Sequence, residues 1–187
     1  SSERVLGSVI QKGIERGLWE RMDLVITTKL HMGGRGQKDS INSIGLSRKH
    51  LYEGCVASLA RLQLEYVDCI FCHRPDPRTP IEETVRGMNH LIDRGALSLL
   101  PPLPVISSYK TEKSLCAGLA FYWGTSEWSS QMLQEARDVA NRLGLVPPFF
   151  DQTQYSMIHR ERVEVEYEPL YPDLGLTIWS PLAGGVL

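Results

Sequence analysis

Five short apolar segments alternate with amphipathic segments along this chain, and that alternation is the strongest constraint on its fold. Each apolar segment has the length of a buried strand and carries a polar residue at or near its C-terminal turn. The segments are residues 24–29, 66–72, 121–126, 149–155 and 176–180. Strands that alternate with helices pair in parallel through right-handed crossovers, so the sequence predicts an α/β fold with about five parallel strands and intervening helices.

The segments between the apolar runs carry apolar residues at helical spacing. Ser47 is expected to cap the helix that follows it, and Gly95 and Gly144 are expected to end two later helices. A weaker helical pattern precedes the last strand. The predicted helices are residues 2–16, 47–62, 80–94, 130–143 and 161–170.

Residues 97–118 interrupt the alternation of strands and helices, since the stretch begins apolar, contains three prolines and shows neither strand alternation nor a helical stripe. A structureless segment of this length counts against a place in a packed core. We therefore expect a single domain over residues 1–187 that is interrupted by a disordered insertion at about 97–118.

Charge and composition exclude several classes of protein. The 187 residues carry a net charge of −2 with a pI near 6.2, without the dense Lys/Arg stripe that nucleic-acid binding needs. No apolar run approaches the roughly 20 residues that cross a bilayer. The four cysteines show no disulfide framework, which fits a reducing compartment. We therefore expect a cytoplasmic protein that neither binds nucleic acid nor inserts directly into a membrane.

Five stretches of the chain carry specific motifs: LSRKHLYEG, SLARLQLEYVD, CHRPDPRTPIEETVRGMNHLIDRG, AFYWGTSEWSS and WSPLAGGVL. Together they resemble the aldo-keto reductase family, and within it the branch of voltage-gated potassium channel β subunits. The resemblance implies a (β/α)8 TIM barrel of typically about 250 residues, with its active site at the C-terminal ends of the strands. By this comparison the chain is truncated at both ends and holds the third to the seventh strand, so the barrel is incomplete.

The resemblance implies reversible hydride transfer between a nicotinamide cofactor and a carbonyl, for which the family uses Asp, Tyr, Lys and His. Lys29 matches the family lysine, whose charge lowers the pKa of the tyrosine that protonates the developing alkoxide. His73 matches the histidine that polarises the carbonyl by hydrogen bonding. The family Asp and Tyr would lie just upstream of Ser1. Taken singly, Lys29 could be a solvated lysine and His73 a hydrogen-bonded loop histidine, but their places at successive strand ends favour the catalytic interpretation.

Cofactor contacts follow from the same resemblance, which implies NADP(H) in preference to NAD by family habit alone. Ser126, Glu127 and Gln152 match the positions that hold the nicotinamide carboxamide and its nearby edge. The ring and the pyrophosphate would lie against Trp179, Ser180, Pro181, Leu182, Ala183 and Gly184. Glu127 stands where animal channel β subunits have Arg, and Trp179 could instead be a plain core aromatic.

Three functional hypotheses remain open from the sequence. The parent protein could be a working reductase of a small carbonyl substrate, an aldehyde or a ketone. It could instead be a cytoplasmic regulatory subunit of a potassium channel that senses its bound cofactor, with a channel α subunit and further copies of itself as partners. The third hypothesis is a truncated fragment that does neither. His73 favours catalysis, since animal channel β subunits carry Asn at the matching position.

The sequence predicts no metal site, because none of the histidines outside the proposed site has ligand spacing with a partner. Cys69, Cys72 and His73 fit the pattern of covalent haem attachment. Residues three apart on a strand point to opposite faces, so the two thiols could not easily reach one porphyrin.

Overall fold

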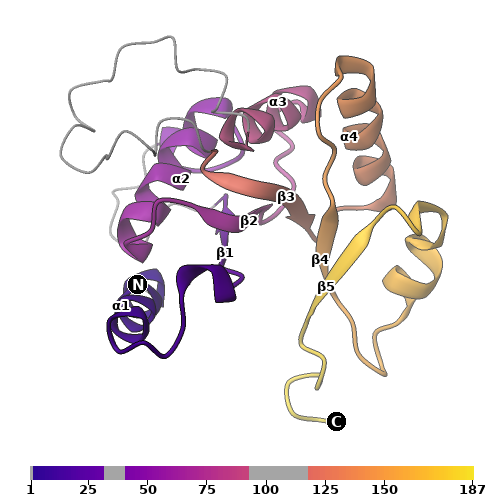
Figure 1. Ribbon diagram of the computed structural model, residues 1–187. Helices are drawn as coiled ribbons and strands as arrows, with labels where there is room; N and C mark the ends of the chain where they lie inside the picture. The colour runs from indigo at the N-terminus through magenta and orange to yellow at the C-terminus, as the bar shows by residue number, and fades with distance from the viewer. Residues whose placement is uncertain (1, 32–40, 93–117) are drawn as a thin grey trace.

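The computed structural model describes residues 2–31, 41–92 and 118–187. The five strands within these ranges form one parallel sheet in chain order (Figure 1). They are β1 (Thr27–Leu30), β2 (Val67–Cys72), β3 (Ala120–Ser126), β4 (Phe150–Gln154) and β5 (Gly175–Trp179). The predicted α/β fold is confirmed as part of a (β/α)8 barrel. The insertion predicted at 97–118 lies outside the described residues, apart from its last position.

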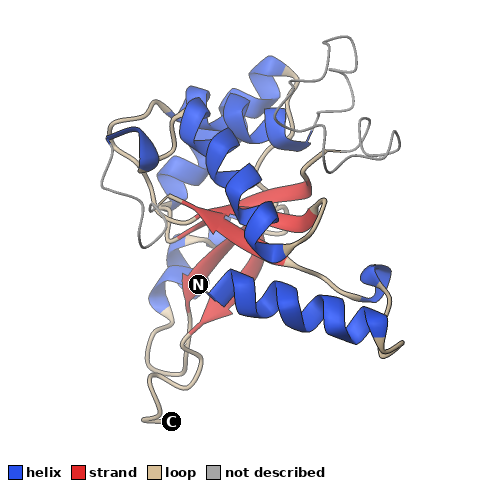
Figure 2. Cartoon of the chain, turned by 90° about the vertical axis from the view of Figure 1, so that its left-hand side faces the viewer, coloured by secondary structure: helices blue, strands red, loops and turns tan. Residues whose placement is uncertain are grey.

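Helices alternate with these strands, as the sequence predicts. Helices α2 (Arg48–Leu62), α3 (Ile81–Ile92) and α4 (Ser130–Leu143) connect successive strands and pack side by side against the sheet (Figure 2). Helix α1 (Ser2–Glu15) packs against α2. The shorter helical turns are η1 (Arg21–Asp23), η2 (Ile41–Ser43), η6 (Arg162–Glu166) and η7 (Glu168–Leu170). The weak helix predicted over 161–170 is therefore a π-helical turn followed by a 3-10 turn.

Local sequence signals set the ends of two helices. The hydroxyl of Ser47 accepts a hydrogen bond from the backbone N–H of His50, which starts α2. At the start of α4, the hydroxyl of Ser129 likewise accepts a hydrogen bond from the backbone N–H of Met132. Gly144 ends α4 in the left-handed conformation, with φ of 63°. The starts predicted at Ser47 and near residue 130 are thus confirmed, as is the stop at Gly144.

Strand β1 begins later than the sequence predicts. Residues 24–26 were expected to be strand, but the N–H of Leu24 bonds to the carbonyl of Arg21 and so closes η1. The N–H of Ile26 donates to the carboxylate of Asp68 instead of a ladder carbonyl (2.7 Å). Regular pairing with β2 starts only at Thr27. The carbonyl of Ile26 already accepts from the N–H of Asp68 (2.8 Å), so it is the N–H side of Ile26 that the side-chain acceptor removes from regular strand pairing.

The core lies between one face of the sheet and helices α2, α3 and α4. Alternate strand residues such as Ile70, Cys72 and Trp123 point to this face and are fully buried. The helix residues packed in the same core include Leu51, Cys55, Leu62, Val85, Met88, Leu91, Leu133, Ala136 and Ala140.

The opposite face of the sheet, which in a closed barrel is the interior, is more open among the described residues. Tyr122 on β3 keeps half of its surface exposed. Phe71 and Phe150 pack on each other with ring centroids 4.8 Å apart. Gly124 leaves room for this pair, since a Cβ there would lie 2.1 Å from the Phe150 ring.

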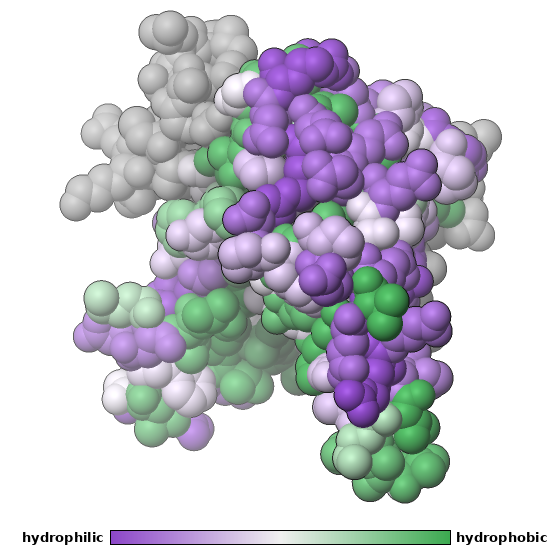
Figure 3. All heavy atoms as spheres, turned by 90° about the vertical axis from the view of Figure 1, so that its right-hand side faces the viewer, coloured by the Kyte–Doolittle hydropathy of each residue, from purple (hydrophilic) through white to green (hydrophobic). Residues whose placement is uncertain are grey.

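Apolar side chains are also exposed in the C-terminal segment after β5. Leu182 and Val186 are 62% and 79% exposed. Figure 3 shows apolar surface at the lower end of the molecule, where the C-terminus lies in Figure 1, below a largely hydrophilic upper part.

Candidate active site

The strand register places five of the predicted site residues along one edge of the sheet. Lys29 pairs with Phe71, which pairs with Gly124, so these three share a face. Two residues further along β3, Ser126 returns to the same face, and His73 comes directly after the last residue of β2, two positions beyond Phe71. Ser126 pairs with Gln152, which pairs with Thr177, two residues before Trp179. Lys29, His73, Ser126, Gln152 and Trp179 thus lie along one edge of the sheet, and among them the hydroxyl of Ser126 bonds directly to the carbonyl of Gln152.

Lys29 is half-buried near the end of β1, with its ammonium 4.9 Å from the centroid of the Phe71 ring. Burial lowers the pKa of Lys29, and the positive charge of Arg74 lowers it further. No ion pair of Lys29 lies within the described ranges. This lysine is therefore held in a partly desolvated, electropositive setting beside an aromatic ring.

His73 follows directly on β2, and its backbone N–H donates to the carbonyl of Leu30 at 2.8 Å. Burial lowers the pKa of His73, and the charges of Arg74 and Lys29 lower it further. The imidazole is accordingly neutral at pH 7, with one ring N–H to donate. This one N–H is sufficient to hydrogen-bond a carbonyl oxygen.

Arg74 ties the ends of three strands together, a role that sequence reasoning missed. Its Nη1 donates to the hydroxyl of Ser126 and to the carbonyl of His73, both at 3.0 Å. Ser126 in turn donates to the carbonyl of Gln152 at 2.9 Å. The only sequence signal was the position of Arg74 in the polar cluster that directly follows β2.

Asp76 shapes the loop that carries His73 and Arg74. Its buried carboxylate accepts from the N–H of Leu46 (2.9 Å), the N–H of Arg78 (3.0 Å) and the hydroxyl of Thr79 (2.8 Å). Although burial alone raises the pKa of Asp76, these hydrogen bonds hold it below its usual value.

Asp151 on β4 is a second buried carboxylate that sequence reasoning missed, and it lies behind the site. Its oxygens accept from the hydroxyl of Thr125 (2.7 Å), the hydroxyl of Tyr167 (3.2 Å) and the N–H groups of Glu127 (3.2 Å) and Trp128 (3.4 Å). Burial raises the pKa of Asp151 in spite of these bonds. The position of an acidic residue inside a predicted apolar strand was the sequence signal that could have identified Asp151 as a buried carboxylate.

Glu127 reaches from the end of β3 to the ends of β4 and β5. Its Oε1 accepts from the indole Nε1 of Trp179 and from the backbone N–H of Gln154, both at 2.7 Å. Its Oε2 lies 3.4 Å from Nη1 of Arg162 on η6. The structure therefore gives Glu127 a definite set of partners, which the sequence left open.

The predicted pyrophosphate segment forms a turn after β5. Ser180 and Ala183 both have positive φ, 53° and 47°, and the N–H of Ala183 donates to the carbonyl of Ser180 at 3.0 Å. Pro181, Leu182 and Gly184 are exposed. Among the described residues, no hydrogen bond joins residues 181–184 to Lys29, His73, Ser126 or Gln152.

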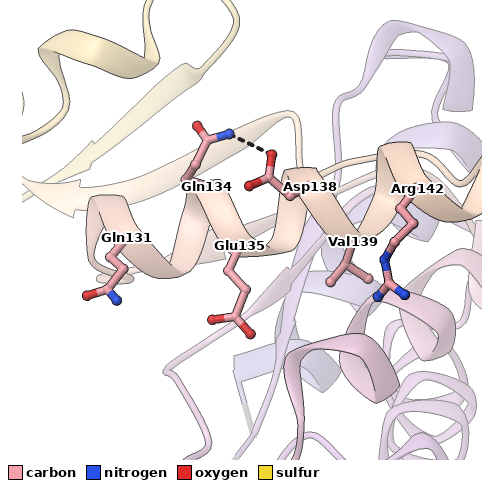
Figure 4. Close-up of a pocket in the computed structure, with 6 residues that line it drawn as sticks. All are labelled: Gln131, Gln134, Glu135, Asp138, Val139 and Arg142. Atoms are coloured by element: carbon pink, nitrogen blue, oxygen red, sulfur yellow. Dashed lines mark hydrogen bonds between the residues drawn. The ribbon is translucent and has the colours of Figure 1, made fainter.

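A surface depression lies elsewhere, along the outer side of α4 (Figure 4). It is lined by Gln131, Gln134, Glu135, Asp138, Val139 and Arg142, and Gln134 donates to Asp138 at 2.8 Å. None of the predicted site residues lines it.

Neither a metal centre nor a membrane span emerges from the described ranges. No group of three or more His, Cys, Asp or Glu side chains there could hold a metal ion. None of the helices in these ranges combines the length and apolar character that a bilayer crossing requires. Cys72 is fully buried and burial raises its thiol pKa, while Cys69 is only half-buried.

These features define a class: a parallel α/β barrel segment with polar side chains gathered at the carboxyl ends of its strands, where barrel enzymes have their active sites. The family model of the aldo/keto reductase family matches residues 1–187. The chain therefore belongs to the aldo/keto reductase family.

Two plant proteins are among its relatives, and both are described as a "Probable voltage-gated potassium channel subunit beta". The protein from Arabidopsis thaliana is 48% identical over 188 aligned positions, which cover 100% of this chain and 48% of the relative. The protein from Oryza sativa subsp. japonica is 50% identical over 171 positions, which cover 90% of this chain and 44% of the relative. The chain thus spans about half the length of the curated relatives it matches.

Proposed function

We propose that this chain is part of an NADP(H)-dependent oxidoreductase that transfers hydride between the nicotinamide and an aldehyde or ketone. The observation that carries the proposal is the position of Lys29, His73, Ser126, Gln152 and Trp179 along one edge of the sheet. Family membership supports it, because aldo/keto reductases are oxidoreductases of carbonyl compounds. In this proposal residues 1–187 form a partial domain interrupted near 97–118.

Two side chains act on the carbonyl. Neutral His73 donates a hydrogen bond to the carbonyl oxygen and so stabilises the charge that develops on it. Lys29 supplies a positive charge next to that oxygen and favours protonation of the alkoxide by a neighbouring acid. Because the chain spans about half the length of the curated relatives it matches, we assign cofactor binding to this chain and propose turnover for a protein that contains it.

The remaining residues fit a nicotinamide cofactor, which supplies the hydride when bound. Gln152 offers an amide that can pair with a carboxamide. Ser126 is buried, and its hydroxyl accepts from Arg74 and donates to the carbonyl of Gln152, so it holds the end of β4 in place. Trp179 is 37% exposed and offers an aromatic face to a flat ring. The turn at 180–184 offers backbone N–H groups to a pyrophosphate. The preference for NADP(H) over NAD remains a family expectation.

A titration of the 187-residue chain with NADPH, followed by quenching of its four tryptophans, tests cofactor binding. Gln152→Ala should weaken binding roughly two- to tenfold, the worth of one or two hydrogen bonds. Gln131→Ala on the outside of α4 is the matched control and should change nothing. Absence of saturable binding would contradict the proposal and favour the hypothesis of a non-functional fragment. Equal effects of the two variants would contradict the placement of the cofactor against Gln152.

The relatives' description supports a second candidate, a cytoplasmic regulatory β subunit of a voltage-gated potassium channel. Such a subunit would bind the cofactor, join a channel α subunit and assemble with further copies of itself. The two candidates differ in a longer protein that contains this chain. Aldehyde turnover that is lost in His73→Asn but kept in His159→Asn favours the reductase. Co-purification with a channel α subunit in the absence of turnover favours the subunit.

A further inference from the structure

The carboxylate of Glu127 is the one side chain that joins the ends of β3, β4 and β5 in the described structure. It accepts from the indole Nε1 of Trp179 and from the N–H of Gln154, each at 2.7 Å. Thr153 adds a longer contact at 3.4 Å. Bonds between a charged acceptor and N–H donors of this length are stronger than neutral ones.

The backbone of Glu127 is held in an unusual conformation that aims the side chain this way. Its φ is 59°, in the left-handed region that residues other than Gly rarely adopt. Its N–H donates to the carbonyl of Gln152 at 3.1 Å and to the carboxylate of Asp151 at 3.2 Å. Backbone strain of this kind persists where the surroundings fix it, and it concentrates at functional sites.

Trp179 depends on this contact for its orientation. It ends β5, at the edge of the sheet, and its side chain is partly open to solvent. Its indole nitrogen has Glu127 as its hydrogen-bond partner in the described structure. Arg162 supports the carboxylate from its other side, with Nη1 at 3.4 Å from Oε2. The ring plane of Trp179 is therefore set by a residue that lies 52 positions earlier in the chain.

The geometry points to Glu127 as a positioning residue, which fixes the indole plane of Trp179 and thereby the aromatic face offered to the nicotinamide ring. This inference rests on the proposed function, because it takes Trp179 as a cofactor contact. The loss of the carboxylate leaves the indole free to turn, so the cofactor must then order it on binding.

The bond itself is tested by nuclear magnetic resonance of the 187-residue chain labelled with ¹⁵N-tryptophan. Each of the four tryptophans gives one indole N–H signal, and Trp179→Phe identifies the signal of Trp179. That signal should be protected from exchange with water, and the protection should be lost in Glu127→Ala and largely kept in Glu127→Gln. Glu168→Ala, an exposed glutamate on η7, is the matched control. The signal of Trp123, whose Nε1 bonds to the carbonyl of Val146, reports that the variants remain folded.

Cofactor affinity is then measured on the same variants by NADPH titration. The dissociation constant should rise roughly tenfold in Glu127→Ala and little in Glu127→Gln. An unchanged Trp179 signal in Glu127→Ala would overturn the positioning bond. A lost bond with unchanged NADPH affinity would overturn the link to the cofactor. If the wild-type chain binds no NADPH, the proposed function is overturned, and with it the claim that Glu127 affects cofactor affinity. The exchange data would still show whether Glu127 holds the indole of Trp179.

Discussion

The hydroxyl of Thr125 should contribute measurably to stability, because it donates to a carboxylate that has no access to water. Asp151 is 0% exposed, and the bond from Thr125 is its shortest, at 2.7 Å. Thr125→Val keeps the shape of the side chain and removes only the donor. The loss of a hydrogen bond to a charged group should lower the free energy of unfolding by about 1.5–3 kcal/mol.

The loss of stability in Thr125→Val should depend on pH, and the burial of Asp151 determines the direction of that dependence. Burial raises the pKa of this carboxyl in the folded chain, and the bond from Thr125 opposes that rise. A group with a raised folded pKa contributes stability at low pH that is lost as pH rises through that pKa. Thr125→Val raises the folded pKa further, so its penalty should be largest at neutral pH and should shrink in acid, where the carboxyl is protonated.

Urea unfolding followed by circular dichroism measures both effects. Stabilities of wild type and Thr125→Val are compared at about pH 7 and about pH 4. Thr177→Val on the exposed surface of β5 is the matched control, with an expected change within about 0.5 kcal/mol. In an Asp151→Asn background the penalty should fall, as a double-mutant cycle would show. A penalty equal to that of the control, or one that grows in acid, would refute the reasoning.

Three further predictions follow from individual contacts. Gly124→Ala should lower the free energy of unfolding by about 1–3 kcal/mol in urea titrations, because its Cβ would lie 2.4 Å from a β4 carbonyl. Gly54→Ala in α2 is the control: its Cβ would meet only flexible side-chain ends, so this change should be neutral or stabilising. Arg74→Met should raise the pKa of His73 in an NMR titration, since a positive charge that lowers it is removed, and an unchanged midpoint would contradict this. Burial alone raises the pKa of Glu3, but its hydrogen bonds hold that pKa below the usual value. The stability advantage of wild type over Glu3→Gln should therefore shrink as pH falls through the pKa of Glu3 in the folded chain. An advantage that stays constant with pH would contradict this prediction.

Much of the fold could be predicted because its signals are local. A serine hydroxyl caps α2 within three residues, and Gly144 ends α4 because it adopts positive φ without a Cβ clash. The late start of β1 could not be predicted, because it depends on Asp68, which is 42 positions away from Ile26. The turns η6 and η7 likewise replaced a regular helix that the apolar pattern only weakly favoured.

The sequence by itself determined the alternation of strands and helices along the chain and the polar side chains that end the strands, since alternation of period and short-range capping are properties of neighbouring residues. The order of the strands within the sheet came from the structure. Only the tertiary structure decided which of those side chains meet. Arg74 reaches Ser126 and Glu127 reaches Trp179, each pair 52 positions apart, because parallel pairing brings the same ends of successive strands to one edge. Only the tertiary structure could bury Asp151, because its burial requires Thr125, Tyr167 and the turn at Trp128 to close around one carboxylate.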